Sequence, residues 1–223
     1  MTDRIAIIGG TGKEGKGLAY RWAKAGLEVV IGSRQAEKAQ IAADEVNDLI
    51  GASGIQVVGK DNLTAAQDGE IVVLTVPFEF HVQMLEMLRE ALKGKILIDV
   101  TVPLVPPKVT KVQMPAAGSA ALEAKATLDP STEVVAAFQN ISYERLITDD
   151  DIDCDVLVSG SAKEARRLVL ELVAKVGMVG WDAGPIENTV VVEGLTSVLI
   201  GINKEFGSHT AGIKITGIDR NAN

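Results

Sequence analysis

A glycine-rich turn follows the first apolar segment of the chain and has the spacing of a phosphate-binding loop. The chain reads IAII over residues 5–8 and GGTGKEG over residues 9–15. In the pattern Gly10-x-Gly12-x-x-Gly15, the glycines turn the chain tightly, bring bare backbone up to a pyrophosphate and pack the next helix on its strand. The pyrophosphate would lie at the N-terminus of that helix, where unpaired N–H groups and the helix dipole favour negative charge. The residues predicted to hold the dinucleotide here are Gly10, Thr11, Gly12, Lys13, Glu14 and Gly15.

The residues on either side of this turn form the context that a dinucleotide site requires. Apolar residues at helical spacing predict a helix over 13–24, which Ala25-Gly26 ends. A second apolar run, residues 27–31, predicts the next strand and completes a βαβ unit of the right length.

The end of that second strand indicates which dinucleotide binds. A chain that binds NAD normally has Asp or Glu there to accept the ribose 2′-hydroxyl, but this chain has Ser33 and Arg34. A hydroxyl and a guanidinium suit a 2′-phosphate, which favours NADP(H). Lys38 could close over the same phosphate or the adenine, or it could simply solvate the surface. Thr11 could donate a hydrogen bond from the other side.

Length and composition exclude several classes of function. With 223 residues, the chain has room for one nucleotide-binding domain and a modest second lobe. A net charge of −8 argues against nucleic acid or an anionic membrane as the partner, so we expect a small-molecule substrate. Cys154 is the single cysteine, which fits a reducing cytoplasm. We expect no secretory leader, and no segment reaches the roughly 18 apolar residues of a membrane span.

Metal binding is not expected from this sequence. The two histidines, His81 and His209, are far apart, and neither has Cys, His or carboxylate residues at a ligand spacing.

The order of the predicted elements indicates an α/β fold. Six strands alternate with helices up to about residue 138 and predict a doubly wound parallel Rossmann sheet. The third of these strands is expected over residues 55–58. An acidic cluster at residues 149–153 is a reasonable boundary, so residues 1–148 are expected to form the NADP-binding domain. Residues 149–223 are expected to form a small C-terminal α/β lobe that closes the substrate cleft, with a long helix over 187–206.

Over nearly its whole length the chain resembles the NADP-dependent coenzyme F-420 reductases. The resemblance rests on the glycine turn, on Gly32-Ser33-Arg34 with Lys38, and on Thr75-Val76-Pro77. It continues through Asp182-Ala183-Gly184-Pro185, the segment 192–196 and Gly212-Ile213-Lys214.

The resemblance implies hydride exchange between NADPH and an 8-hydroxy-5-deazaflavin, coenzyme F-420, in a cleft between two lobes. It places Ile141 and Thr196 along the stacked rings. Gln139 stands where the family often carries His, and it can donate a hydrogen bond but cannot be a cation. The residues that the resemblance places beneath the nicotinamide are Thr75, Val76, Pro77 and Val102.

The chemistry of the residues is compatible with this interpretation. A deazaflavin accepts hydride at carbon and delocalises the charge, so the protein need only bind, stack and exclude water. Accordingly, no convincing acid–base pair is visible. On the long helix, Thr196 and Ser197 could hydrogen-bond a ring carbonyl. Glu193 and Lys204 could simply make structural or subunit contacts.

Two other functions stay open from the sequence. The first is an NADPH-dependent reductase of an imine, a carbonyl or a metal chelate, with Lys204 as its acid. The second is a non-catalytic sensor that binds NADPH. For any of the three functions, the apolar long helix suggests self-association, and we expect a homodimer.

Overall fold

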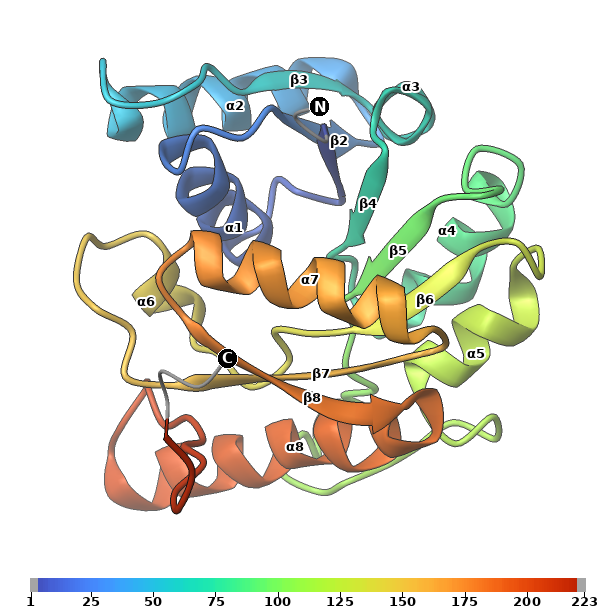
Figure 1. The fold of residues 1–223 in the computed structure, drawn as a ribbon, viewed down its shortest axis with the longest axis vertical. Helices are drawn as coiled ribbons and strands as arrows, with labels where there is room; N and C mark the ends of the chain where they lie inside the picture. Colours follow the sequence, from blue (N-terminus) through green and yellow to red (C-terminus); the bar gives the residue numbers. More distant parts are fainter. Residues whose placement is uncertain (1–3, 220–223) are drawn as a thin grey trace.

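An eight-stranded sheet forms the centre of the protein (Figure 1). The structure, a computed structural model, describes residues 4–219. The strand order is β3-β2-β1-β4-β5-β6-β7-β8. The strands are β1 (Ile5–Ile8), β2 (Val29–Ser33), β3 (Val58–Asp61), β4 (Ile71–Leu74), β5 (Ile96–Asp99), β6 (Glu133–Ala136), β7 (Asp155–Gly160) and β8 (Val179–Pro185).

Strands β1 to β6 are parallel and form the doubly wound part of the sheet. Every residue of β1 and β4 is buried, as expected for parallel strands covered on both faces. The chain order reverses between β1 and β4, and ligands of such sheets bind at the carboxyl ends of the strands beside this point. The predicted α/β Rossmann class is confirmed.

Helices cover both faces of the sheet. Ile5 and Ile7 pack into a core with α1, α2 and α7, whereas Ala6 and Ile8 face a second core with α3, α4 and α5. In Figure 1, α7 and α8 lie on opposite sides of β7 and β8. The helices are α1 (Lys13–Lys24), α2 (Ala36–Ile50), α3 (Asn62–Asp68), α4 (His81–Leu88), α5 (Ala120–Thr127), α6 (Tyr143–Leu146), α7 (Lys163–Lys175) and α8 (Thr189–Phe206), with short 3₁₀ turns η1 (Phe78–Phe80) and η2 (Ile186–Asn188).

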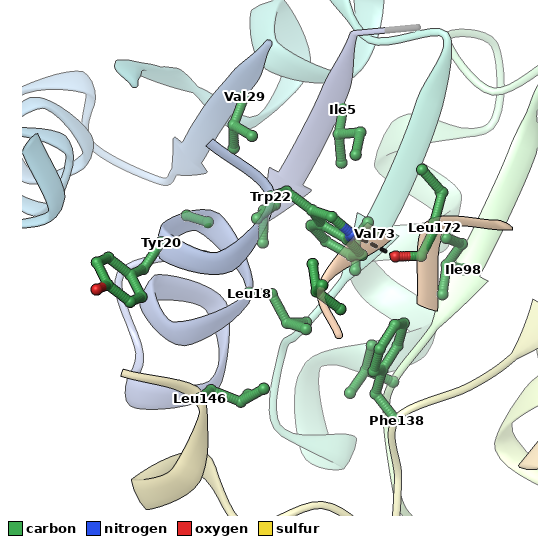
Figure 2. Packing of buried hydrophobic residues seen from close by; sticks show 14 of the residues in the cluster. Ile5, Leu18, Tyr20, Trp22, Val29, Val73, Ile98, Phe138, Leu146 and Leu172 are labelled. Atoms are coloured by element: carbon green, nitrogen blue, oxygen red, sulfur yellow. Dashed lines mark hydrogen bonds between the residues drawn. The ribbon is translucent and has the colours of Figure 1, made fainter. Parts of the chain in front are cut away.

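The sheet continues across the boundary that the sequence suggested between residues 148 and 149. Strand β7 pairs antiparallel with β6, and β8 then pairs parallel with β7. The core is also shared, because Trp22 of α1 donates a hydrogen bond to the Leu172 carbonyl of α7 at 3.2 Å (Figure 2). The division into two domains stays a prediction.

Helix α1 holds the acidic segment around residue 149 against the nucleotide-binding half. The Arg21 guanidinium donates to the carbonyls of Leu146 and Thr148 at 3.0 and 2.6 Å. Tyr20 donates to Asp149 at 2.5 Å, and Lys24 pairs with the same carboxylate. Side chains of α1 therefore hold residues 145–150 in place, and this segment is not a purely solvated loop.

Two local features differ from the sequence prediction. The third strand begins at Val58 rather than residue 55, because the Asn47 side chain bonds both the N–H and the carbonyl of Val57 and keeps them from the ladder. The short helix α6 was not predicted, and its four residues are too few to show a helical period.

Candidate active site

The glycine turn leaves bare backbone at the start of α1. The Gly10 N–H donates to the Gly32 carbonyl at 3.0 Å, which ties the turn to the end of β2. A Cβ on Gly15 would lie 2.5 Å from Gly10 Cα, so only glycine lets α1 approach the turn this closely. A Cβ on Gly12 would meet no atom within 4 Å, and no side chain caps the first N–H groups of α1. The turn therefore has the open space and the free donors that a phosphate needs.

Two unpaired cations follow β2 beside this turn. Ser33 is buried, whereas Arg34 and Lys38 are exposed, and no described carboxylate forms an ion pair with either cation. The Arg34 guanidinium lies 5.7 Å above the centre of the Phe80 ring. These side chains are available to bind an anion.

A cleft of about 540 Å³ opens next to the glycine turn, along the ends of β4, β5 and β6. It brings together residues from segments as far apart as Gly12 and Ala211. The predicted site residues that line it are Gly12, Lys13, Glu14, Thr75, Val76, Pro77, Val102, Gln139, Ile141 and Thr196. Those outside its lining are Gly10, Thr11, Gly15, Ser33, Arg34, Lys38 and Ser197. Their roles in binding stay predictions.

Phe138 turns the chain from β6 into the cleft. Its φ is +72°, an uncommon value for a bulky residue. Its ring packs edge-on against Trp22 with the centroids 5.6 Å apart (Figure 2). The shared core thus fixes the direction in which Gln139 and Asn140 leave the strand.

Hydrogen bonds within the protein engage polar side chains of the loop that follows Phe138 and of α8. Gln139 Nε2 donates to the Asp99 carbonyl at 2.7 Å, and Asn140 Nδ2 donates to the Val192 carbonyl at 3.0 Å. The Thr196 hydroxyl donates to the Gln139 carbonyl at 2.9 Å. The single hydroxyl hydrogen of Thr196 is therefore engaged within the protein, whereas the Gln139 amide has a second N–H. The contacts of both residues with a ligand stay predictions. The two residues fasten this loop to β5 and α8.

Two residues of α8 lie away from the cleft, contrary to expectation. Ser197 is buried outside the lining, and Lys204 is exposed to solvent and does not reach it. The face of α8 that lines the cleft carries Thr196, Leu199, Ile200 and Asn203. Of the α8 residues that the sequence analysis named for the site, Thr196 therefore lines the cleft, and steps of four and three residues from it lead to Ile200 and Asn203. Sequence reasoning missed Tyr143, His209 and Ala211, which line the cleft from α6 and from the segment after α8.

Four buried polar atoms in the residues that line the cleft have no hydrogen-bond partner within the described chain. They are Glu14 Oε1, Thr101 Oγ1, Gln139 Oε1 and Asn140 Oδ1. The orientations of the two amides are fixed, since their nitrogens donate to backbone carbonyls. Leaving a buried acceptor unpaired costs about 1–3 kcal/mol, so each of these atoms calls for a polar partner such as a water molecule or a ligand group. A dinucleotide supplies carboxamide and ribose donors, and the residues present fit it.

A buried charge cluster supports the cleft from behind. His81 Nε2 lies 2.8 Å from Asp99 Oδ2, and its Nδ1 lies 3.1 Å from Glu123 Oε2. Burial lowers the pKa of His81, but the two carboxylates outweigh burial and raise that pKa to about 9. Asp99 also accepts from the Thr101 N–H at 3.0 Å, so the cluster positions the strand end that lines the cleft.

Glu193 joins α8 to α5 inside the protein. Its two carboxylate oxygens accept from the N–H groups of Ala120 and Ala121 at 2.7 and 3.0 Å. Burial, followed by the charge of Asp99, raises the pKa of Glu193 to about 8. The hydroxyls of Ser119 and Thr189 lie 2.6 Å apart beside it. Glu193 therefore has a structural role, one of the two that the sequence left open.

Within residues 4–219, no group of three or more His, Cys, Asp or Glu side chains is arranged to hold a metal ion. None of the described helices combines the length and the apolar character of a membrane span.

Comparison with known proteins identifies relatives along the whole chain. Residues 4–103 match the model of a family described as NADP oxidoreductase coenzyme F420-dependent. An F420-dependent NADP reductase from Methanocaldococcus jannaschii is 38% identical, with 97% of this chain and 99% of the relative covered. A second, from Methanothermobacter marburgensis, is 40% identical, with 96% and 99% covered.

Solved structures agree with this result. A crystal structure from Arthrobacter sp. FB24, itself assigned as an F420-dependent NADP reductase, has a TM-score of 0.78 and 26% identity. The alignment covers 96% of this chain and 99% of that one. The resemblance recognised in the sequence is confirmed, and the chain belongs to the family of F420-dependent NADP reductases.

Proposed function

We propose that the protein transfers hydride between NADP(H) and the deazaflavin coenzyme F-420. The observation that carries this proposal is one continuous cleft that starts at the glycine turn and ends against α8, with unpaired buried acceptors in its wall. The names of the relatives from methanogens support the same pair of substrates.

Residues of the nucleotide-binding half would hold NADP(H). The pyrophosphate would lie over Gly12 at the N-terminus of α1, with Thr11 beside it. Ser33 and Arg34 would bind the 2′-phosphate, and Lys38 could add a second cation. Support comes from the two unpaired cations and from the absence of an acidic side chain at 33 and 34.

The remaining walls would align the two ring systems. The bound nicotinamide supplies the hydride, and the chain itself holds the rings in contact and keeps water out. The Thr75 hydroxyl donates to the Ile8 carbonyl at 3.0 Å, which fixes the strand end beneath the ring. The apolar residues available for stacking and for excluding water are Val76, Pro77, Val102, Leu104, Ile141, Leu199 and Ile200.

The test is direct spectroscopy with the purified protein. NADPH added to protein and oxidised F-420 should bleach the visible absorbance of the deazaflavin, whereas FMN in the same assay should stay oxidised. Unchanged absorbance across the neutral pH range, with NADPH binding shown by calorimetry, would rule the deazaflavin out. That result would leave the NADPH-binding sensor as the better hypothesis.

The alternative hypothesis, a reductase of an imine, a carbonyl or a metal chelate, required a proton donor in the cleft. Lys204 was the candidate donor, and its side chain is exposed outside the cleft lining. No observation in the structure favours that function over deazaflavin reduction.

We also propose that the protein is a homodimer that pairs through α8. One face of this helix exposes four apolar side chains at helical spacing: Val191 (62% exposed), Val198 (47%), Ile202 (42%) and Phe206 (78%). A second copy of the same stripe would cover them. Light scattering should give twice the chain mass for the natural protein and the monomer mass for Val198→Glu. A natural protein of monomer mass would refute the dimer.

A cytoplasmic location belongs to the same proposal. Its support is that Cys154 is the single cysteine of the sequence, so the chain has no internal disulfide of the kind that oxidising compartments favour.

A further inference from the structure

Glu14 is a titratable residue in the wall of the cleft, and one of its carboxyl oxygens has no partner among the described residues. It is the second residue of α1 and lines the cleft next to Gly12 and Lys13. Its Oε1 atom is buried and has no hydrogen-bond partner among the described residues. Burial raises the pKa of Glu14 to about 8. The folded chain thus keeps a titratable group where a ligand would be bound.

The position of Glu14 points to the nicotinamide half of the cofactor. Under the proposed function, on which this inference rests, the adenosine end lies at Ser33 and Arg34, outside the cleft lining. The cleft extends the other way from Gly12, along Thr75 and Pro77. Because the nicotinamide ribose is attached directly to the pyrophosphate, a residue two positions beyond Gly12 that lines the cleft lies on the nicotinamide side.

The charge of the nicotinamide ring changes in the reaction. Loss of hydride from NADPH removes two electrons and one hydrogen nucleus together, and the neutral ring becomes a cation. A nearby carboxylate attracts the cation and has no comparable effect on the neutral ring. We propose that ionised Glu14 makes the protein bind NADP⁺ more tightly relative to NADPH, and that protonation of Glu14 removes this preference.

Other charged groups around the cleft must be separated from Glu14. Lys13, on the same helix, donates to the Tyr143 hydroxyl at 3.3 Å and lies 4.7 Å from the centre of that ring. His209 lines the cleft from the segment after α8. On β5, the charge of Asp99 is paired with His81. Of these groups, His209 is the one without an ion pair or a side-chain hydrogen bond in the described structure, so it is tested alongside Glu14.

The experiment measures the dissociation constants of NADP⁺ and NADPH by calorimetry between pH 7 and 9.5, without F-420. For the natural protein, the ratio of the NADP⁺ constant to the NADPH constant should fall about tenfold as the pH rises, comparable to one pKa unit of coupling. Glu14→Gln should hold the ratio at its low-pH value. Glu90→Gln, an exposed glutamate paired with Lys93 far along the chain from the turn, should behave like the natural protein.

Three outcomes would overturn the inference. They are a ratio in the natural protein that does not change with pH, a Glu14→Gln variant that keeps the change, and a His209→Asn variant that abolishes it. Binding of neither nucleotide would refute the proposed function together with the inference. A pH-dependent ratio in a protein that does not reduce F-420 would support Glu14 and refute only the proposed acceptor.

Discussion

The two walls of the cleft are built on different principles. The nucleotide wall consists of glycine backbone at the start of α1, with the exposed cation Arg34 just outside the cleft lining, and few long-range hydrogen bonds between side chains hold it. The opposite wall, made by the loop after β6 and by α8, is fastened by polar groups such as the buried Glu193 and the half-buried Thr196. The structure of the first wall therefore requires that its glycines carry no side chains, whereas the structure of the second requires that its hydrogen bonds are formed.

The difference matters for how each wall responds to change. A turn that binds phosphate through its backbone needs space, so added atoms harm it. In a wall of buried polar groups, each group needs its hydrogen-bond partner. Removing a partner or changing the protonation of a group therefore destabilises that wall.

The largest effect that we expect comes from pH and acts on the α8 wall. His81 and Glu193 have pKa values of about 9 and about 8 in the folded protein, above their ordinary values of 6.5 and 4.5. The folded state therefore keeps protons that the unfolded state releases, and the free energy of unfolding must fall as the pH rises. The loss runs from pH 4.5 to 8 for Glu193 and from 6.5 to 9 for His81, at about 1.4 kcal/mol per pH unit for each proton.

Urea unfolding at a series of pH values measures this loss. In Glu193→Gln, the free energy of unfolding should depend less on pH below pH 8. The pH dependence of Glu14→Gln gives the contribution of Glu14, the other carboxyl group that titrates in this range. A stability that stays constant between pH 6.5 and 8 would contradict the assignment of these protons.

On the nucleotide wall, two glycine variants should separate folding from binding. Gly15→Ala forces a Cβ to 2.5 Å from Gly10 Cα and should destabilise the fold by about 1–3 kcal/mol. Gly12→Ala meets no protein atom within 4 Å and has a φ of −75°, so its stability should be unchanged while NADPH binding weakens. Urea unfolding measures the stability of both variants and calorimetry their affinity for NADPH. An unchanged affinity in Gly12→Ala would show that Gly12 has no special role in binding.

Arg34→Ala should weaken NADPH binding by about 1.5–3 kcal/mol, or roughly 10- to 150-fold, because a charge-assisted contact to the 2′-phosphate is lost. NADH, which lacks that phosphate, should bind as before. Calorimetry with both nucleotides makes the measurement, and Arg89→Ala, an exposed arginine just after α4, is the matched control. Equal losses for NADPH and NADH would mean that Arg34 does not contact the phosphate.

Thr196→Val should have the smallest effect, about 1 kcal/mol of stability, because the Gln139 carbonyl loses a donor at 2.9 Å. The loop after β6 would also loosen, so the KM for F-420 should rise more than kcat falls. Thr216→Val, at an exposed position, should change neither quantity. An unchanged KM in Thr196→Val would separate this hydrogen bond from the substrate wall.

The sequence was a good guide wherever a short segment determines its own structure. The turn at Gly10 to Gly15 and the buried strand β4 follow from glycine geometry and from apolar runs, and both were predicted. It was a poor guide at Ser197 and Lys204, because a helix that is apolar on most sides does not reveal which face a cleft will touch. The position at which β3 begins also depended on a distant side chain, because Asn47 bonds the backbone of Val57, the residue before the strand.

By itself, the sequence determined the Rossmann class, the phosphate turn and the family, since these depend on local spacing that is legible along the chain. Only the tertiary structure decided that Gln139 and Thr196 bond to backbone carbonyls, that Glu193 caps α5, and that Glu14 Oε1 lacks a partner among the described residues. The physical reason is that a buried polar group is defined by the atoms around it. Those atoms come from segments that are separated by tens of residues and meet only in the folded chain.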